Sequence, residues 1–430
     1  MKPRIALVLA ASIGLAACQS DDVTPPAAPS MSAAASQENF LSVVPEQALN
    51  NSQSRLLAGI KDRFTTAEVH LARIAGTRGR SLEQGGVLHI GVAPGVQVTA
   101  VGEKVTRRSA EDVSWAGPVR GGQGWVQMVY ADGGVNATIR LGESTVYSIE
   151  PLGDGLHAVT RIDQHGYPSE HAPENPSGAL AAVIEDASTR GRPGGSTGDT
   201  GGGTVGIQAL STQNVLVVYT AAAAAATANI SSLIQLAVDE TNQSYVNSGI
   251  SIDMVRVHTA QVTYKEKGTF SQHISRLQGT SDGYMDDVHA LRNTYAADVV
   301  VLVVNDSEAC GIAAAINATA ATAFAVAHYS CITGYYSFAH EIGHLQGARH
   351  DRFVDGTLTP YPYGHGFIPS TKNWRTVMAY GNNCNNCTRI QWWSNPLVTY
   401  PATGQAMGTA TYEDNARVLN LTALTVAAFR

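Results

Sequence analysis

Three histidines and one glutamate lie in one short stretch of the chain, at a spacing that can bind a metal ion. His340 and His344 are four residues apart, so on a helix both imidazoles project from one face and can bind the same zinc ion. Glu341, between them, can act as general base on a water molecule. Gly347 allows the positive φ of a sharp turn, which would bring back His350 as third ligand. Three nitrogens with one position left for water indicate a catalytic zinc site.

The pattern is longer than a bare H-E-x-x-H, which also occurs by chance. The glycine and the third histidine follow at the offsets that the turn requires, and a methionine motif lies downstream. We therefore predict one catalytic zinc ion, and the sequence makes no prediction for calcium.

The first residues have the features of an export signal. Lys2 and Arg4 precede an apolar run, residues 5–11, which is too short to cross a bilayer as a stable helix. Residues 15–18 are similar to a bacterial lipobox, which makes Cys18 the expected lipidation site. An ordinary signal peptide with an incidental cysteine is the alternative. We expect an exported bacterial protein, either secreted or held at the outer membrane or cell surface as a lipoprotein.

The charge of the chain argues against binding to nucleic acid. Lys and Arg number 28 against 35 Asp and Glu, which gives a formal net charge of −7, and no basic run stands out. Contact with a membrane is expected only through the possible lipid anchor. We expect a monomer.

Four cysteines remain when Cys18 is set aside, and they allow three pairings. Disulfides are expected in an oxidising compartment. Pairing Cys310 with Cys331 and Cys384 with Cys387 keeps both loops local, so we favour it. A zinc site or a redox motif at the last two cysteines is the alternative.

Composition divides the chain into five segments. Residues 39–77 have helical spacing that suggests one or two short helices, and residues 87–163 contain period-two runs typical of an antiparallel sheet or small sandwich. His157, within these runs, is isolated and predicted to be structural or exposed. The predicted segments are a signal peptide with lipobox over 1–18, a tether over 19–38, a β-rich prosegment over 39–189, a Gly-rich linker over 190–206 and the zinc-binding catalytic domain over 207–430. This layout indicates a zymogen, with a permanent two-domain protein as the alternative.

Strands alternate with helices after the linker. The predicted strands cover 215–220, 250–264 and 298–304, with an edge strand over 324–328; the predicted helices cover 230–246 and 285–295, and the metal-binding helix begins at about residue 336. Such an order predicts an α/β (α+β) domain with a mixed, mainly parallel sheet and an active-site helix, preceded by the β-rich segment.

Residues 340–351, together with residues 376–380, resemble the metzincin zinc endopeptidases. The resemblance implies that Met378 is the Met-turn methionine beneath the metal; an ordinary core methionine is the alternative. It also implies that Tyr380 lies near the zinc, as a weak ligand or as a group that stabilises the transition state, as in astacins and serralysins. Asp351 matches the adamalysin-type pattern instead.

A narrower resemblance is to the bacterial peptidyl-Asp metalloendopeptidases, the endoproteinase Asp-N type. It covers roughly residues 215–430 and is carried by residues 337–351, 363–367, 374–380, 393–396, 414–419 and 427–430. It implies a zinc endopeptidase that cuts on the N-terminal side of aspartate, less readily of glutamate.

Selectivity for an acidic residue needs a physical cause. A carboxylate that leaves water for the S1′ pocket must meet a fixed cation and hydrogen bonds. The family builds the wall of this pocket after the Met-turn, where Arg389 lies, and Arg375 is the second candidate. For each arginine, a solvated surface position is the alternative. We expect the substrate to add as an extended strand to a sheet edge, at residues 324–328.

Two acidic sites bear on latency and maturation. Asp199, after Gly198, would cap the zinc as an astacin-type prosegment aspartate does, or would mark a self-processing site, as would the bond before Asp186. The alternative functions are an adamalysin-like endopeptidase with an apolar P1′ preference and an inactive surface binding lipoprotein. The intact Glu341 argues against the inactive form.

Overall fold

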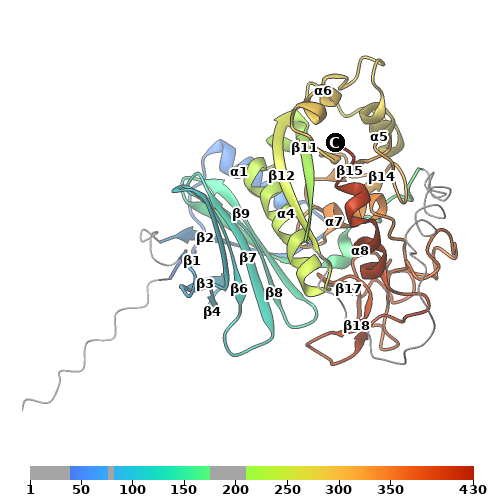
Figure 1. The fold of residues 1–430 in the computed structure, drawn as a ribbon. Coiled ribbons are helices and arrows are strands. Elements are labelled where there is room, and N and C mark those ends of the chain that lie inside the picture. Colours follow the sequence, from blue (N-terminus) through green and yellow to red (C-terminus); the bar gives the residue numbers. More distant parts are fainter. Residues whose placement is uncertain (1–38, 76–81, 175–209) are drawn as a thin grey trace, which may run out of the picture. The chain divides into compact units, whose positions relative to one another are not determined.

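Two β-sheets form the framework of this computed structural model, which describes residues 39–75, 82–174 and 210–430 (Figure 1). All of these residues fall in a single compact unit, Glu38–Arg430. Among them, no helix combines the length and the apolar character needed to cross a bilayer. The predicted segment boundaries, like Cys18 and the linker, lie at or outside the limits of the described residues and stay predictions.

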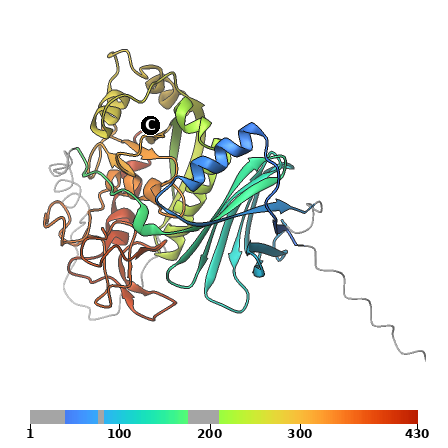
Figure 2. The ribbon, with the colours of Figure 1, turned by 180° about the vertical axis from the view of Figure 1, so that it is seen from behind.

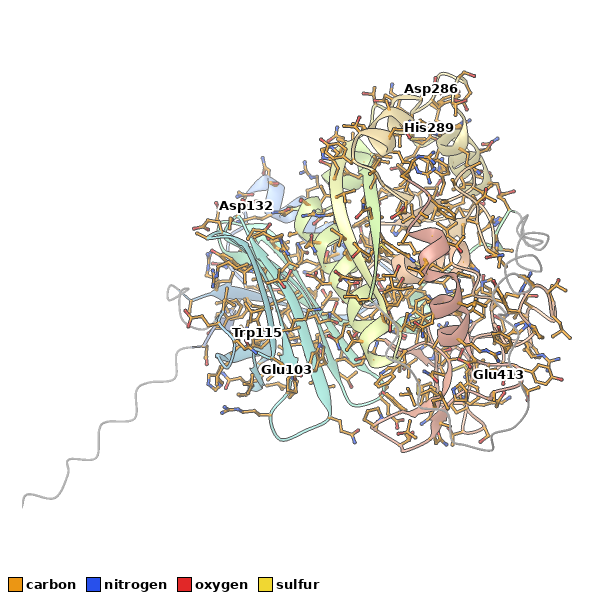
Figure 3. The ribbon with its side chains drawn as sticks, in the orientation of Figure 1. Glu103, Trp115, Asp132, Asp286, His289 and Glu413 are labelled. Carbon is orange, nitrogen blue, oxygen red and sulfur yellow. A yellow bond between two sulfur atoms is a disulfide. The ribbon has the colours of Figure 1, made fainter. Side chains whose placement is uncertain are left out.

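The N-terminal sheet has ten strands in the order β4-β3-β1-β2-β10-β9-β8-β7-β6-β5, and only β1 and β3 pair in parallel. Tight hairpins connect several of its strands: Asp132 and Gly133 both have positive φ between β7 and β8, as a type I′ turn requires (Figure 3). Trp115 of β6 is buried against one face (Figure 3). The strands are β1 (Leu41–Val44), β2 (Thr66–Ile74), β3 (Val87–Ala93), β4 (Val96–Val101), β5 (Lys104–Ser109), β6 (Asp112–Pro118), β7 (Gly124–Ala131), β8 (Gly134–Leu141), β9 (Thr145–Gly153) and β10 (Leu156–Ile162).

The helical prediction for residues 39–77 was wrong in part. One helix, α1 (Asn51–Lys61), forms after a capping box at Asn50. Val69 and Leu71 instead lie in strand β2, because their period-two spacing lets β2 pair with β1 on one side and β10 on the other.

The C-terminal sheet has the order β12-β11-β13-β15-β14, parallel except for the antiparallel pair of β14 and β15. Its strands are β11 (Ser211–Tyr219), β12 (Ile252–Gln261), β13 (Val299–Val304), β14 (Gly311–Ala313) and β15 (Phe324–His328). Residues 324–328 form the predicted strand, but its edge position was wrong. The chain returns after β13 as β14 and covers that edge, so the outer strand of the described sheet is β14.

Helices cover both faces of this sheet, because alternate residues of its buried strands point to opposite sides (Figures 1 and 2). One face packs against α4 (Ile230–Asn247), α7 (Ser337–Leu345) and α8 (Asn415–Val426), and the other against α5 (Phe270–Gln278) and α6 (Asp287–Thr294). A short helix, α3 (Ala221–Ala225), follows β11. The mixed sheet and the active-site helix agree with the predicted α/β class.

Small elements complete the C-terminal region. β16 (Trp374–Arg375) pairs in parallel with β17 (Thr388–Arg389), which places the two candidate arginines in register. β18 (Asn395–Thr399) pairs with β19 (Ala406–Met407), and η1 (Gln164–Gly166) follows the N-terminal sheet. Both disulfides have the favoured local pairing, Cys310–Cys331 and Cys384–Cys387.

Candidate active site

Helix α7 carries His340 and His344 on one face and is buried along its whole length. It ends in a Schellman-type turn: Ala348 N–H donates to the carbonyl of Gly343 at 2.8 Å, and Gly347 has φ 106°. A Cβ on Gly347 would lie 3.0 Å from Val418 of α8, so both conformation and space require glycine. The turn brings His350 back to the helix, as the spacing predicts.

The three imidazoles converge on one point. Nε2 of His350 lies 3.2 Å from Nε2 of His340 and 2.9 Å from Nε2 of His344. The Nδ1 atoms of His340 and His344 donate to the carbonyls of Val377 and Ala348, both at 2.9 Å, which leaves each Nε2 with a lone pair. Burial lowers the pKa of all three rings, that of His344 to about 4, and so favours the neutral ligand form.

This cluster fits a zinc ion. Lone pairs that face one another at such distances repel unless a cation lies between them. Tetrahedral Zn–N bonds of about 2.0–2.1 Å place ligand nitrogens about 3.3 Å apart, close to the separations in the cluster. Among the described residues, these histidines form the one group of His, Cys, Asp and Glu side chains close enough to hold a metal. The site binds one catalytic zinc ion.

Glu341 is buried beside the cluster, and neither of its carboxylate oxygens has a hydrogen-bond partner among the described residues. Burial, and then the nearby Glu170 carboxylate, raise its pKa well above the usual range. A Cβ on Gly311 of β14 would lie only 2.5 Å from Oε1 of Glu341, so glycine at the sheet edge makes room for the side chain. An uncommitted carboxylate at this position can accept a proton.

The segment after the ligands supports the site from below. Met378 is fully buried, and a Cβ on Gly343 of α7 would lie 3.0 Å from its sulfur, so the helix rests directly on the methionine. The ring of Tyr380 lies 4.1 Å from that of His350, and its backbone N–H donates to Asp351 at 2.8 Å. Met378 therefore packs against α7, and Tyr380 lies beside the ring of His350.

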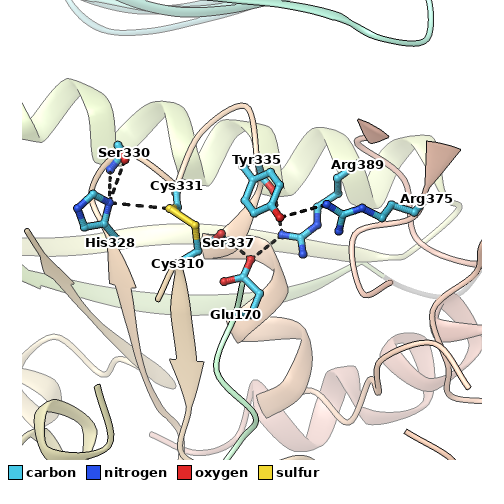
Figure 4. Close-up of a disulfide and its surroundings, with 9 residues drawn as sticks. All are labelled: Glu170, Cys310, His328, Ser330, Cys331, Tyr335, Ser337, Arg375 and Arg389. Atoms are coloured by element: carbon cyan, nitrogen blue, oxygen red, sulfur yellow. Dashed lines mark hydrogen bonds and ion pairs between the residues drawn. A yellow bond between two sulfur atoms is a disulfide. The ribbon is translucent and has the colours of Figure 1, made fainter. Parts of the chain in front are cut away.

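Arg389 forms a fully buried ion pair with a residue that the sequence did not single out (Figure 4). Its Nη1 donates to Oε1 of Glu170 at 2.6 Å, and the two side chains are 1% and 0% exposed. The hydroxyl of Ser337 donates to the same oxygen at 2.7 Å, and the guanidinium lies 4.1 Å from the centroid of the Tyr335 ring. No local pattern around Glu170 marks it, because its partners follow it by more than 160 residues.

Arg375 is buried as well but binds no carboxylate among the described residues. It donates to the carbonyls of Cys387 and Ala379 and to the hydroxyl of Tyr335. These bonds stabilise the loop that follows Met378. The alternative of solvated surface arginines was therefore wrong for both Arg375 and Arg389, which are 2% and 1% exposed.

Residues 167–174, which we call the strap, run beside β14 at the open edge of the sheet. The N–H of Cys310 donates to Ser169 at 3.1 Å, and the N–H groups of His171 and Glu174 donate to Gly311 at 2.7 Å and Ala313 at 3.1 Å. The partner numbers rise together, so the strap is parallel to β14. The hydroxyl of Tyr380 donates to the Glu170 carbonyl at 3.0 Å. Gly198, Asp199 and Asp186 lie outside the described residues.

Comparisons with known proteins agree with this site. A family model described as Metallo-peptidase family M12, Reprolysin_5, matches residues 209–392. A peptidyl-Asp metalloendopeptidase of Stenotrophomonas maltophilia (strain K279a) is 44% identical over 293 residues, which are 67% of this chain and 66% of that protein. One of Xanthomonas campestris pv. campestris is 42% identical over 69% of this chain and 67% of the relative. One of Pseudomonas fragi is 41% identical over 44% of this chain and 100% of the relative. This chain thus spans about two thirds of the length of the first two.

Proposed function

Since the chain belongs to the peptidyl-Asp metalloendopeptidase family and is a zinc-dependent metalloendopeptidase, we propose that it cuts peptide bonds on the N-terminal side of aspartate, and less readily of glutamate. The observation that carries this specificity is the ion pair of Arg389 with Glu170. It supports a carboxylate-binding pocket next to the catalytic base, because Ser337, which binds the same Glu170 carboxylate, lies about one helical turn before Glu341 on α7.

The alternative functions are less compatible with these contacts. An apolar P1′ side chain would leave the buried charge of Arg389 without a partner once Glu170 leaves, which is costly. An inactive binding protein would have no use for a buried, unpartnered Glu341 carboxylate. Both observations favour an active peptidase that binds an acidic P1′ residue.

The residues divide the chemistry among them. His340, His344 and His350 would hold the zinc, which would supply Lewis acidity for a substrate carbonyl and for a water molecule. Glu341 takes the proton of the attacking water and passes it to the leaving amine. The Tyr380 hydroxyl donates to the substrate's carbonyl oxygen, as it now does to that of Glu170. Arg389 and Ser337 bind the carboxylate of the P1′ residue.

The substrate is proposed to bind as an extended strand along β14. This strand is three residues long and antiparallel to β15. Its outer side offers the carbonyls of Gly311 and Ala313, and Cys310, just before it, offers its N–H. A peptide of any sequence can form main-chain hydrogen bonds with a strand edge. The specificity must therefore come from the side-chain pocket.

We also propose that the chain is exported and made as a zymogen, with the N-terminal sheet and the strap as its prosegment. The apolar run after Lys2 and Arg4 supports export, and Cys18 is the proposed lipid anchor. The strap supports latency because it occupies the substrate edge. Removal of the prosegment would leave a monomeric peptidase.

A cleavage-site map tests the specificity. The matured protein is incubated with an unfolded, sequence-diverse peptide mixture, with and without a chelator, and the new termini are sequenced. We expect chelator-sensitive cuts mainly before aspartate. Cuts before leucine or phenylalanine would retain the zinc chemistry and refute the acidic pocket, whereas no cuts would favour the inactive scaffold.

A further inference from the structure

We propose that the strap is an internal ligand whose Glu170 carboxylate occupies the pocket meant for the acidic side chain of a substrate, and thereby keeps the intact chain inactive. This inference rests on the proposed function. The strap directly follows the N-terminal sheet in the sequence. The Glu170 side chain is nevertheless completely buried among Arg389, Ser337 and Tyr335 of the catalytic region (Figure 4).

The polar contacts of Glu170 are those that an acidic substrate residue would need. Two donors, the guanidinium of Arg389 and the hydroxyl of Ser337, bind one carboxylate oxygen at 2.6 and 2.7 Å. The other oxygen, Oε2, is buried without a partner among the described residues. Burying a carboxylate is costly unless a cation receives it, so this pocket is selective for an acid whether the strap or a substrate supplies it.

The backbone of the strap takes up the remaining substrate contacts. It forms two hydrogen bonds to β14 and one to Cys310 just before this strand, and the Glu170 carbonyl accepts from Tyr380. Gln164, just before the strap, fixes the wall of the pocket: its side chain accepts from the N–H of Arg389 at 2.7 Å and donates to the carbonyl of Arg389 at 3.3 Å. Tyr167 stacks on Tyr335 at 4.1 Å. A peptide cannot reach the edge, the tyrosine or the arginine while the strap is in place.

The geometry also explains why the strap is a ligand and not a substrate. Cleavage before an acid requires attack on the carbonyl of the preceding residue, which in the strap is Ser169. That carbonyl is bound by the N–H of Cys310 at the sheet edge. The carbonyl that Tyr380 holds belongs to Glu170 itself. The acid therefore fills the pocket while the wrong peptide group faces the catalytic tyrosine.

The strap also differs from a side chain that caps the metal. In the described part of the chain, the group that can hold an ion consists of His340, His344 and His350, without Glu170. Glu170 instead neutralises the charge of Arg389, the cation proposed to bind the P1′ carboxylate.

The experiment compares three intact, zinc-loaded full-length chains on a fluorogenic peptide with a single aspartate: wild type, Glu170→Gln and Glu174→Gln. Glu174 is the matched control, because it is a second acid of the strap whose side chain is exposed. Mass spectrometry confirms that each chain is uncut during the assay. We expect intact Glu170→Gln to be at least about ten times more active than the intact wild type, because the strap loses a charge-assisted hydrogen bond. Glu174→Gln should have the activity of the intact wild type.

Two controls separate the possible failures. If the matured wild type cleaves the peptide but intact Glu170→Gln is as inactive as the intact wild type, the strap is not the inhibitor and the proposed function stands. If the matured wild type does not cleave either, both proposals fail. If Glu170→Gln does not fold, Glu170→Asp decides, because it retains the charge but withdraws it by one methylene: a partial gain of activity supports the inference, and a loss or no change overturns it.

Discussion

Glu341 has the environment that a general base needs before a substrate arrives. Its oxygens are buried, have no partner among the described residues and lie beside the zinc ligands. The desolvation that raises its pKa also increases its tendency to take a proton from water. A residue kept in this state at a cost in stability is explained by chemistry more readily than by packing.

We predict that Glu341→Gln binds zinc but loses peptidase activity by roughly 10²–10⁴-fold, the usual contribution of a positioned acid–base group. The amide fills the same space but cannot accept the proton. Zinc content by elemental analysis and kcat/KM on an aspartate peptide check this. Full activity in the variant would contradict the assigned role.

The proposed preference for an acidic P1′ residue depends on Arg389. In Arg389→Met, we predict that the ratio of kcat/KM for two peptides that differ only by Asp or Asn at P1′ falls by roughly 10–150-fold, the equivalent of a hydrogen bond to a charged group. A ratio within one enzyme preparation is independent of how much protein is folded. Arg375→Met is the control, since Arg375 donates to carbonyls and a hydroxyl and should leave the ratio unchanged.

At the scale of elements, the N-terminal sheet depends on a buried histidine that the sequence correctly gave no catalytic role. His157 of β10 donates through Nδ1 to the carbonyl of Gly155 at 3.1 Å and accepts through Nε2 from the N–H of Val135 at 3.0 Å. The bond accepted at Nε2 requires the neutral ring, because both nitrogens of a protonated ring are donors. Burial lowers the pKa of His157 to about 4 from the usual 6.5.

The stability of this sheet should therefore depend on pH. Because the folded pKa is depressed, the contribution of His157 is fully present above about pH 6.5 and is lost as the pH falls through 4. We predict that the free energy of unfolding decreases over this window by up to about 1.4 kcal/mol per pH unit. Denaturant titrations of wild type and His157→Gln at a series of pH values test this prediction. The free energy of unfolding of the variant should fall less steeply with decreasing pH. Identical slopes would rule out His157 as the cause.

At the scale of the whole molecule, α4 joins the two sheets. It packs in the core beneath β11 and β13, while Ser232 accepts from Asn136 of β8 at 2.6 Å and Asp239 accepts from Ser114 of β6. Buried polar contacts of this kind hold the N-terminal sheet in one orientation. These contacts explain how the N-terminal sheet, which contributes none of the three histidine ligands, positions the strap beside the active site.

Zinc should stabilise the whole folded unit, because the three ligands converge only in the folded chain. We predict that a chelator lowers the Tm of the wild type, since zinc at a hundred times its Kd contributes about 2.7 kcal/mol. Calorimetry with zinc or chelator measures the shift. His350→Ala should show a much smaller shift, and an equal shift in both proteins would place the stabilising metal elsewhere.

The sequence by itself determined the zinc site and the order of β11, α4, β12, α6, β13, β15 and α7. His340, Glu341 and His344 lie within about one helical turn, and Gly347 returns the chain to His350, so local geometry alone brings the ligands together. The alternation of buried strands and helices likewise follows from local hydrophobic periods. Such features depend on neighbours in sequence.

Only the tertiary structure decided which strand is the edge, which arginine binds a carboxylate and what covers the site. β15 is internal because β14 returns antiparallel beside it, and Arg375 and Arg389 differ through partners and not through local sequence. Glu170 meets Arg389 across 219 residues. Pairings over such distances depend on how the whole chain packs, for which no local pattern of residues is diagnostic.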